Sequence, residues 1–476
     1  MSANTRTAAV YRTIWRWHFW AGLIVAPFLL ILSATGTIYL FNEEINDALS
    51  PSLRFVPARA ASVPVSRMVR AALAAHPGAV SRIDLPTAPD RPAVVFVEPH
   101  HGPKLRVPVD PGTGRVLGAF VYERTLVGFA DEMHGSLTIG TLGDRIVELA
   151  ACWALVLIGT GLFLWWPRGR WRAAGVLWPR LRGGGRRFWR ELHGPVGLWT
   201  AGLIAFLVVT GLPWAGIEGD VLQRVSSAAG IGYPDSFRTH NMPGSTPMKA
   251  ATGEAPWTLE GAPMPQSAMP GHLGMHSGHA GHEAPAATDD AAAIAGVDRA
   301  VATLARAGMT GGYRFHLPEG PTGVYTAYTY PDQPEGQRTI YVDRYSFRQI
   351  GPEVDFADYG WMGRATELGV AIHMGNYFGF ANQLLMLLPC LGIWALTISG
   401  VAMWWKRRPA GRIGAPPRLS AGRMSGAVAV LIVAGVVLPL FGASLLILSA
   451  LDLAVTRARP QAGNLASAEE HPPTRG

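Results

Sequence analysis

Five stretches of the chain are long and apolar enough to cross a lipid bilayer, and they restrict the fold more than any other feature. A helical span needs about 20 mostly apolar residues. The candidate spans are residues 17–41, 146–166, 194–216, 383–405 and 426–451. The composition agrees, because only 16% of the residues are charged, whereas soluble domains carry about 25%. We therefore predict a multi-pass membrane protein and exclude a soluble globular domain.

Arginine and lysine gather in three short segments beside these apolar stretches. They precede the first span and fill the loops at 167–192 and 406–425. Cytoplasmic loops are rich in Lys and Arg, so we predict a cytoplasmic N-terminus in a bacterial inner membrane. Residues 42–145 and 217–382 are then exported. The net charge of +8 reflects this orientation, and no nucleic-acid binding is expected.

The two exported segments show helix and strand patterns. Residues 42–133 contain a predicted helix at 67–76 and strands at 93–98, 104–109 and 115–121. Residues 290–372 contain a predicted helix at 291–307 and strands at 312–316, 323–330, 338–343 and 347–351. Alternating apolar residues bounded by turn residues are typical of strands. The predicted fold class is a membrane all-α bundle of about five helices with two exported α+β domains.

The remaining segments show no helix or strand pattern. Residues 217–289 are rich in Gly, Pro, Met and His, a composition that predicts a flexible exported linker. Residues 452–476 read as a disordered tail, placed outside the cytoplasm by the fifth span. The two cysteines, Cys152 and Cys390, lie in apolar stretches, which favours inert buried thiols over a disulfide.

The two halves of the chain repeat each other, and such repeats reveal fold organisation. Aligning His18 with His193 superimposes Gly22 on Gly197, Thr35 on Thr210 and Gly36 on Gly211 without a gap. Aligning His134 with His373 superimposes Gly161 on Gly400 and Trp165–Trp166 on Trp404–Trp405. We predict an internal duplication of a helix–domain–helix unit, with the fifth span as an addition.

Four histidines recur at these duplicated positions. His18 and His193 lie at the cytoplasmic ends of the spans at 17–41 and 193–216. His134 and His373 begin the elements 134–166 and 373–405, each predicted as a span with an exported-side extension. Neutral imidazole is a common haem ligand, and two histidines on facing helices can hold one haem. We predict two haem b groups, one between His18 and His193 and one between His134 and His373.

Each of these residues also has a simpler structural interpretation. An interfacial histidine often only hydrogen-bonds a headgroup or caps a helix, and pairing within one half is an alternative. Gly22, Gly36, Gly197 and Gly211 either make room for a porphyrin or form small-residue helix contacts. Glu148 is either a proton partner for quinol oxidation or an ion-pair partner of Arg145.

The linker contains a tract of histidine and methionine. Imidazole and thioether ligands suit copper, so this tract is either a copper site or a low-complexity linker. Its candidate ligands are His272, His276, His279, His282, Met269 and Met275, with Met264 nearby.

Several motifs resemble the PepSY-associated transmembrane family of bacteria across nearly the whole chain. They are WRWHFWAG near residue 15, HGSLTIGTLGDRIVELAACWALVLIGTGLFLWWPRGR from His134, ELHGPVGLW from Glu191, and WWKRR ending the fourth span. The resemblance implies PepSY-like exported domains. His373 is followed by Met374 where His134 is followed by Gly135, a departure that leaves the predicted ligand in place.

The resemblance also implies a function, because the family includes ferric-siderophore reductases with two b-type haems. We expect an oxidoreductase that passes electrons outward to a ferric siderophore or other metal chelate in the periplasm. Neither cytoplasmic loop holds a nicotinamide or flavin motif, so the donor is a quinol or a separate protein. The alternatives are a non-enzymatic membrane scaffold or regulator and a copper-handling protein.

Overall fold

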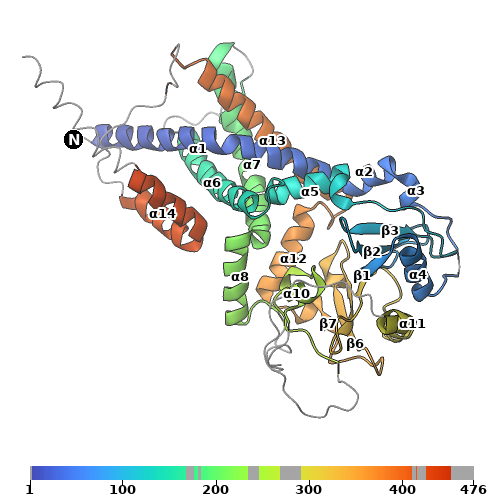
Figure 1. Ribbon diagram of the computed structural model, residues 1–476. Coiled ribbons are helices and arrows are strands. Elements are labelled where there is room, and N and C mark those ends of the chain that lie inside the picture. Colours follow the sequence, from blue (N-terminus) through green and yellow to red (C-terminus); the bar gives the residue numbers. More distant parts are fainter. Residues whose placement is uncertain are drawn as a thin grey trace, which may run out of the picture.

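The computed structural model describes residues 3–59, 61–167, 176–180, 184–233, 246–267, 291–409, 414 and 425–451. Within them, four helices are long and apolar enough to cross a membrane. They are α1 (Ala3–Leu40), α6 (Thr141–Trp165), α7 (Gly185–Gly211) and α13 (Phe380–Trp405). These helices pack α1 on α6, α6 on α7, α7 on α13 and α13 on α1, as Figure 1 shows. The expectation of a multi-pass membrane protein is confirmed by these four helices.

The predicted fifth span, residues 426–451, is not one continuous helix. It consists of α14 (Ser425–Val437) and a second apolar helix, Pro439–Leu451. Proline at 439 lacks a backbone N–H and disfavours helical geometry in the preceding residue. Gly435 and Gly442 lie so close that a Cβ on Gly435 would be 3.0 Å from the Gly442 Cα. Since residues seven apart in a straight helix are about 10 Å apart, the segment forms a tight hairpin (Figure 1).

The predicted elements 134–166 and 373–405 are each divided into two helices. His134 lies on α5 (Leu126–Ser136), and His373 ends α12 (Trp361–His373). Left-handed backbone at Leu137 and Thr138 separates α5 from α6. Gly140 and Gly379, with φ of 63° and 60°, precede α6 and α13. Glycine tolerates this conformation, so each short helix turns away from the long helix that follows.

The strands of both exported segments form one seven-stranded antiparallel sheet, ordered β3-β2-β1-β4-β5-β6-β7. Their bounds are β1 Gly78–Asp84, β2 Ala93–Pro99, β3 Leu105–Val109, β4 Tyr313–His316, β5 Val324–Thr329, β6 Arg338–Asp343 and β7 Val354–Asp355. β1 and β4 join the halves through pairs such as Ile83 with Phe315. The expectation of two separate domains is therefore corrected, because each half has an edge strand whose unpaired backbone groups are satisfied by the other half.

Several strands in the structure differ from those predicted. β1 was not predicted, and residues 115–121 and 347–351 form only isolated bridges, such as Val109 with Val116 and Val342 with Gln349. Both bridges close a turn led by an aspartate. Asp110 accepts from Gly112 N at 2.8 Å, and Asp343 accepts from Ser346 N at 2.7 Å. The predicted strands at 115–121 and 347–351 are therefore wrong in length, because each region pairs only at single positions beside a turn.

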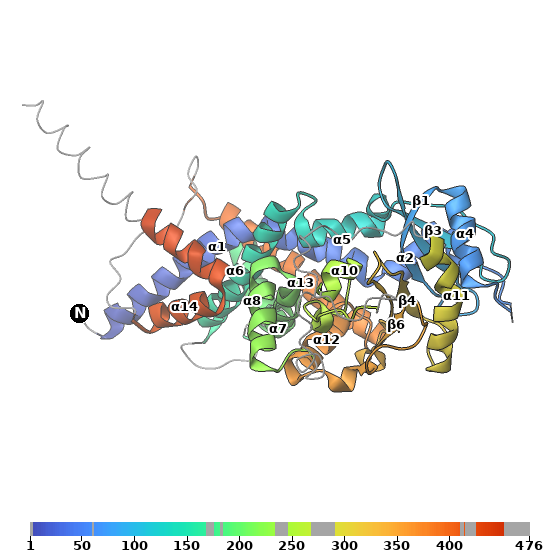
Figure 2. The ribbon, with the colours of Figure 1, turned by 60° about the horizontal axis from the view of Figure 1, so that its bottom comes forward.

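Two helices cover the sheet face that lies away from the long helices. They are α4 (Val65–Ala75) and α11 (Ala291–Arg306), and Figure 2 shows both at the end farthest from the N-terminus. Between them and the sheet lies one apolar core, including Val69, Val95, Phe315 and Val342. The other sheet face is turned toward α5, α10 (Met248–Thr252) and α12 (Figure 1).

Parts of the predicted flexible linker 217–289 are folded. Residues 216–229 form α8, and residues 246–267 contain α10 and a 3₁₀ turn, η3 (Trp257–Leu259). Met248, Leu259 and Met264 are buried in a second core against Tyr328 and Tyr341. These large apolar side chains explain the packing. The remaining short elements are α2 Asn42–Leu49, α3 Pro51–Arg54, η1 Tyr122–Arg124, η2 Leu212–Trp214, η4 Pro334–Gly336 and η5 Phe356–Asp358.

Candidate functional site

Each of the four predicted histidines places its Nδ1 atom against a hydroxyl group on a neighbouring helix. The distances are 2.9 Å for His18–Thr160, 3.1 Å for His134–Thr35, 2.9 Å for His193–Ser399 and 2.9 Å for His373–Thr210. The contacts thus link α1 with α6, α5 with α1, α7 with α13 and α12 with α7. The four rings are half-buried and share one environment.

The hydroxyl groups determine which imidazole nitrogen carries the proton. Each also lies within hydrogen-bond distance of the carbonyl four residues earlier in its own helix, at 2.6–2.8 Å. A hydroxyl has one proton to donate, and the carbonyl can only accept. The hydroxyl therefore accepts from the imidazole Nδ1–H, an assignment from the hydrogen-bond network. The Nε2 lone pair is left available as a ligand.

A glycine follows every one of these hydroxyl residues and lies beneath the imidazole ring. A Cβ atom would be 3.2 Å from His18 Cε1 at Gly161 and 3.3 Å from His134 Cε1 at Gly36. The corresponding distances are 3.4 Å at Gly211 and 3.7 Å at Gly400. A Cβ at Gly161 or Gly36 would force the ring to shift, whereas Gly211 and Gly400 leave room for ordinary contact only, so a Thr/Ser-Gly dipeptide lies against each histidine ring.

Gly22 and Gly197 have a different role. Their nearest neighbours are Leu157 and Leu396, at 3.8 and 3.4 Å from a Cβ. These are apolar contacts between α1 and α6 and between α7 and α13. The small-residue interpretation therefore holds for Gly22 and Gly197, while Gly36 and Gly211 accommodate histidine.

The four rings form two pairs. The centroids of His18 and His193 are 6.4 Å apart, with ring planes at 89°. One metal ion bound by both Nε2 atoms at about 2 Å each would place the centroids about 6 Å apart. His134 and His373 are also close enough to interact electrostatically. Both pairs cross between the halves of the chain, as predicted, and no pairing within one half is seen among these four residues.

The two pairs lie at different levels of the helix bundle. On α1, His18 belongs to one pair, while Thr35 contacts the other pair through His134. On α7, His193 and Thr210 have the same seventeen-residue spacing. A helix rises about 1.5 Å per residue, so the levels are about 26 Å apart. We call His134–His373 the sheet-side pair, because α5 and α12 lead to the sheet (Figure 1), and His18–His193 the distal pair.

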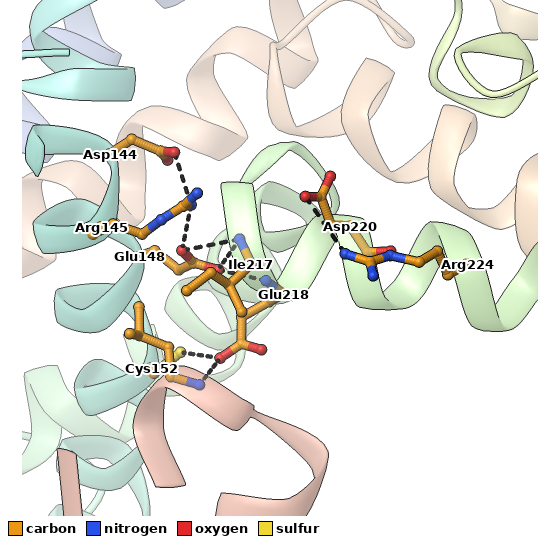
Figure 3. A network of polar contacts seen from close by, with 9 residues as sticks. Asp144, Arg145, Glu148, Cys152, Ile217, Glu218, Asp220 and Arg224 are labelled. Carbon is orange, nitrogen blue, oxygen red and sulfur yellow. Dashed lines mark hydrogen bonds and ion pairs between the residues drawn. The ribbon is translucent and has the colours of Figure 1, made fainter. Parts of the chain in front are cut away.

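Glu148 lies in a polar network between the long helices and the hairpin (Figure 3). Its carboxylate is fully buried, lies 3.2 Å from Arg145, and accepts from Ile217 N at 3.0 Å at the start of α8. Glu218 in turn accepts from Leu440 N at 3.1 Å. The ion-pair interpretation is thus supported, and the network anchors α8 and the hairpin.

The predicted copper ligands His272, His276, His279, His282, Met269 and Met275 lie outside the described residues. Among the described residues, no group of three His, Cys, Asp or Glu side chains forms a metal site. Met264 is described and is part of the second core. Cys152 and Cys390 are buried thiols with no disulfide, as expected.

The sequence indicates the four histidines and aligns Thr35 with Thr210, but it does not indicate that these hydroxyl groups contact the rings. Thr160 and Ser399 were not singled out, although each precedes a glycine that was aligned between the halves. The available signal is a Thr-Gly or Ser-Gly dipeptide at 35, 160, 210 and 399. Because each hydroxyl is on a different helix from its histidine, spacing within one helix does not reveal the contact.

Comparison with known proteins identifies the family to which these helices correspond. Residues 15–407 match the family model described as the PepSY-associated TM region. That range includes all four histidines and ends two residues after α13. No curated protein matches the chain.

Proposed function

The chain belongs to the PepSY-associated transmembrane family, and from this premise we propose that it is a haem b-containing oxidoreductase that carries electrons across a membrane. The observation that supports this most is the fourfold arrangement of a half-buried imidazole on a Thr/Ser-Gly seat. Each seat leaves Nε2 free. A purely structural histidine would have no need for an unused Nε2, and here four such atoms occur in two close pairs of rings.

The distal pair would ligate one haem and the sheet-side pair a second. The 6.4 Å centroid separation of His18 and His193 fits one iron between them. Haem supplies reversible one-electron transfer when bound. The chain's own hydroxyl groups, Thr160 and Ser399, hold the two half-buried rings in place.

The direction of transfer follows from the position of the two pairs. The basic segments beside the distal ends of α6 and α13 predict a cytoplasmic position for His18 and His193 in a bacterial inner membrane. The sheet-side pair then lies at the periplasmic side, next to the exported sheet. We propose a quinol or a separate reductant as the donor and a ferric chelate, as in siderophore reduction, as the acceptor.

The two pairs act in series, and this can be tested in vesicles. Protein is incorporated into liposomes that trap dithionite, and a ferric chelate with a ferrous-specific chromophore is added outside. We expect external iron reduction that requires the protein. His18→Ala/His193→Ala and His134→Ala/His373→Ala should each reduce the rate to that of protein-free vesicles, because either change interrupts the only path.

The matched control is His101→Ala, which alters an exposed histidine in the β2–β3 loop. It should reduce iron at the wild-type rate. Equal rates in the wild type and both double variants would show that electrons do not pass through these histidines, and the proposed function would be wrong.

A further inference from the structure

The sheet face turned toward the membrane helices carries a row of directly paired polar and aromatic residues. Across β3, β2, β1 and β4, Arg106 pairs with Phe96, Phe96 with Arg82, and Arg82 with His316. Residues paired across antiparallel strands point to the same face. Arg314 lies on this face as well, two residues before His316.

Two of the three arginines on this face are neutralised. Arg82 and Arg314 both bind Glu254, Arg314 at 3.0 Å, and Arg82 also binds Asp84 at 2.7 Å. Burial opposes the charge of Arg82, but Asp84 and Glu254 outweigh it and raise its pKa. Asp84 and Glu254 are therefore already paired with these two arginines.

Arg106 differs from them. Its guanidinium lies over the rings of Tyr122 at 3.7 Å and Phe96 at 5.2 Å. No carboxylate of the described residues lies within ion-pair distance of it, and burial lowers its pKa. Arginine presents a planar fork of donors that fits a carboxylate, so this cation has an unused binding capacity.

Further unused groups lie near Arg106 and Arg314. Across the described part of the chain, the Tyr39 and Tyr330 hydroxyls have no hydrogen-bond partner. Tyr39 is close enough to interact electrostatically with both arginines, and the Arg314 guanidinium lies 5.2 Å from the centre of the Tyr330 ring. His316 is buried, and its Nε2 has no partner in the described structure. The uncommitted groups near Arg106 are therefore mainly hydrogen-bond donors.

The cluster adjoins the sheet-side pair. Tyr39 follows Thr35 by one helical turn on α1, and Asp131 precedes His134 by about one turn on α5. Asp131 accepts from Tyr122 Oη at 3.1 Å, and burial raises its pKa. Because Asp131 interacts electrostatically with Arg106, its negative charge would weaken the binding of another anion to Arg106.

We propose that Arg106, together with Tyr39 and Tyr330, forms a carboxylate-binding site beside the sheet-side histidines. The carboxylate belongs either to an anionic ferric chelate or to a propionate of the haem at that level. The choice of a carboxylate-bearing acceptor rests on the proposed function, but the binding of a carboxylate does not. The site favours acidic chelates over neutral or cationic ones.

The test uses gallium(III) citrate, a redox-inert anionic chelate, titrated calorimetrically into the full-length protein in detergent. Arg106→Gln should weaken binding about 10- to 100-fold, since hydrogen bonds to charged groups contribute about 1.5–3 kcal/mol. Asp131→Asn should tighten binding, because it removes a nearby negative charge. The control is Arg299→Gln, which alters an arginine stacked on Phe347 at 3.9 Å on the other face of the sheet.

The visible spectrum of each variant identifies the source of the carboxylate. Weaker gallium citrate binding with an unchanged spectrum assigns the site to the chelate. Unchanged titration with a shifted haem spectrum or lost haem assigns it to a propionate. If Arg106→Gln changes neither property, or if Asp131→Asn weakens binding as Arg106→Gln does, the proposal is overturned. Arg106-dependent binding in protein without haem would support this site while contradicting the proposed function.

Discussion

A hydroxyl group that accepts from histidine Nδ1 is the smallest unit on which the function depends. Thr35, Thr160, Thr210 and Ser399 supply this hydroxyl, and each donates its own proton to a carbonyl of its helix backbone. The second bond prevents the hydroxyl from turning its proton toward the ring. Orientation and tautomer of the ligand are therefore set by one side chain on another helix.

Replacing Thr160 by valine keeps the shape and removes the hydrogen bond to His18. Loss of such an outer partner typically costs about 10- to 100-fold in metal affinity, so we expect Thr160→Val to release haem from the distal pair at lower concentrations of a competing haem acceptor. Thr200→Val is the control, because within the described part of the chain Thr200 Oγ1 bonds only the Val196 carbonyl, at 2.8 Å. Equal haem retention in both variants would contradict the role of the hydroxyl.

Gly161 and Gly159 lie on the same helix but have different surroundings. A Cβ at Gly161 would be 3.2 Å from His18 Cε1, whereas nothing lies within 4 Å of one at Gly159. Gly161→Ala should displace the His18 ring and lower the haem content, while Gly159→Ala should leave it unchanged and favour the helix by about 0.5–1 kcal/mol. The haem content of both variants is measured by the pyridine haemochrome assay. A normal haem content in Gly161→Ala would contradict the role of this glycine.

Much of this residue-scale picture was predictable. The duplicated spacing of His18 with His193 and of His134 with His373 identified the rings and their pairing. The contacts between helices could not be predicted from one sequence, because each hydroxyl is separated from its histidine by 99 to 206 residues. The uncommitted state of Arg106 was equally hidden, since it depends on which carboxylates fold toward the other arginines.

At the scale of elements, apolar length alone was a good guide to four helices and a poor one to the fifth segment. Residues 425–451 are as apolar as a span, but Pro439 interrupts the helix and Gly435 allows its halves to approach. Each half is about 20 Å long or less, too short for about 30 Å of hydrocarbon. The bend is held by Glu218 at Leu440 and by Trp153 against Phe441.

A hairpin has both ends on the same side of a membrane, and a span does not. Ser425→Cys and Leu451→Cys, introduced singly where Cys152 and Cys390 are buried, should react with an impermeant maleimide from the same side of sealed vesicles. Labelling from opposite sides would restore the predicted fifth span and the exported tail.

At the scale of the whole molecule, the two halves form one structure outside the bundle. Besides the β1–β4 pairing, Asp298 on α11 accepts from Ser66 N at 3.0 Å at the start of α4. A carboxylate at a helix N-terminus satisfies free backbone donors. The duplicated pattern predicted two similar units but not that they share one sheet. The sequence of a strand does not show which other strand pairs with its edge.

Removing this contact should therefore destabilise both halves together. Asp298→Ala is expected to lower stability by about 0.5–2 kcal/mol and to increase hydrogen exchange in β1 and β4 alike. Asp332→Ala, at an exposed turn position, is the control and should change neither. Faster exchange confined to β4 in Asp298→Ala would indicate two independent domains.

The central claim is that two histidine pairs at two levels hold two haems, and haem counting tests it most directly. Protein is purified from haem-replete cells, and reduced-minus-oxidised spectra are combined with haem quantitation. We expect two haems per wild-type chain and one in each double variant, His18→Ala/His193→Ala and His134→Ala/His373→Ala. A wild-type protein without haem, or double variants that retain the full haem content, would contradict it.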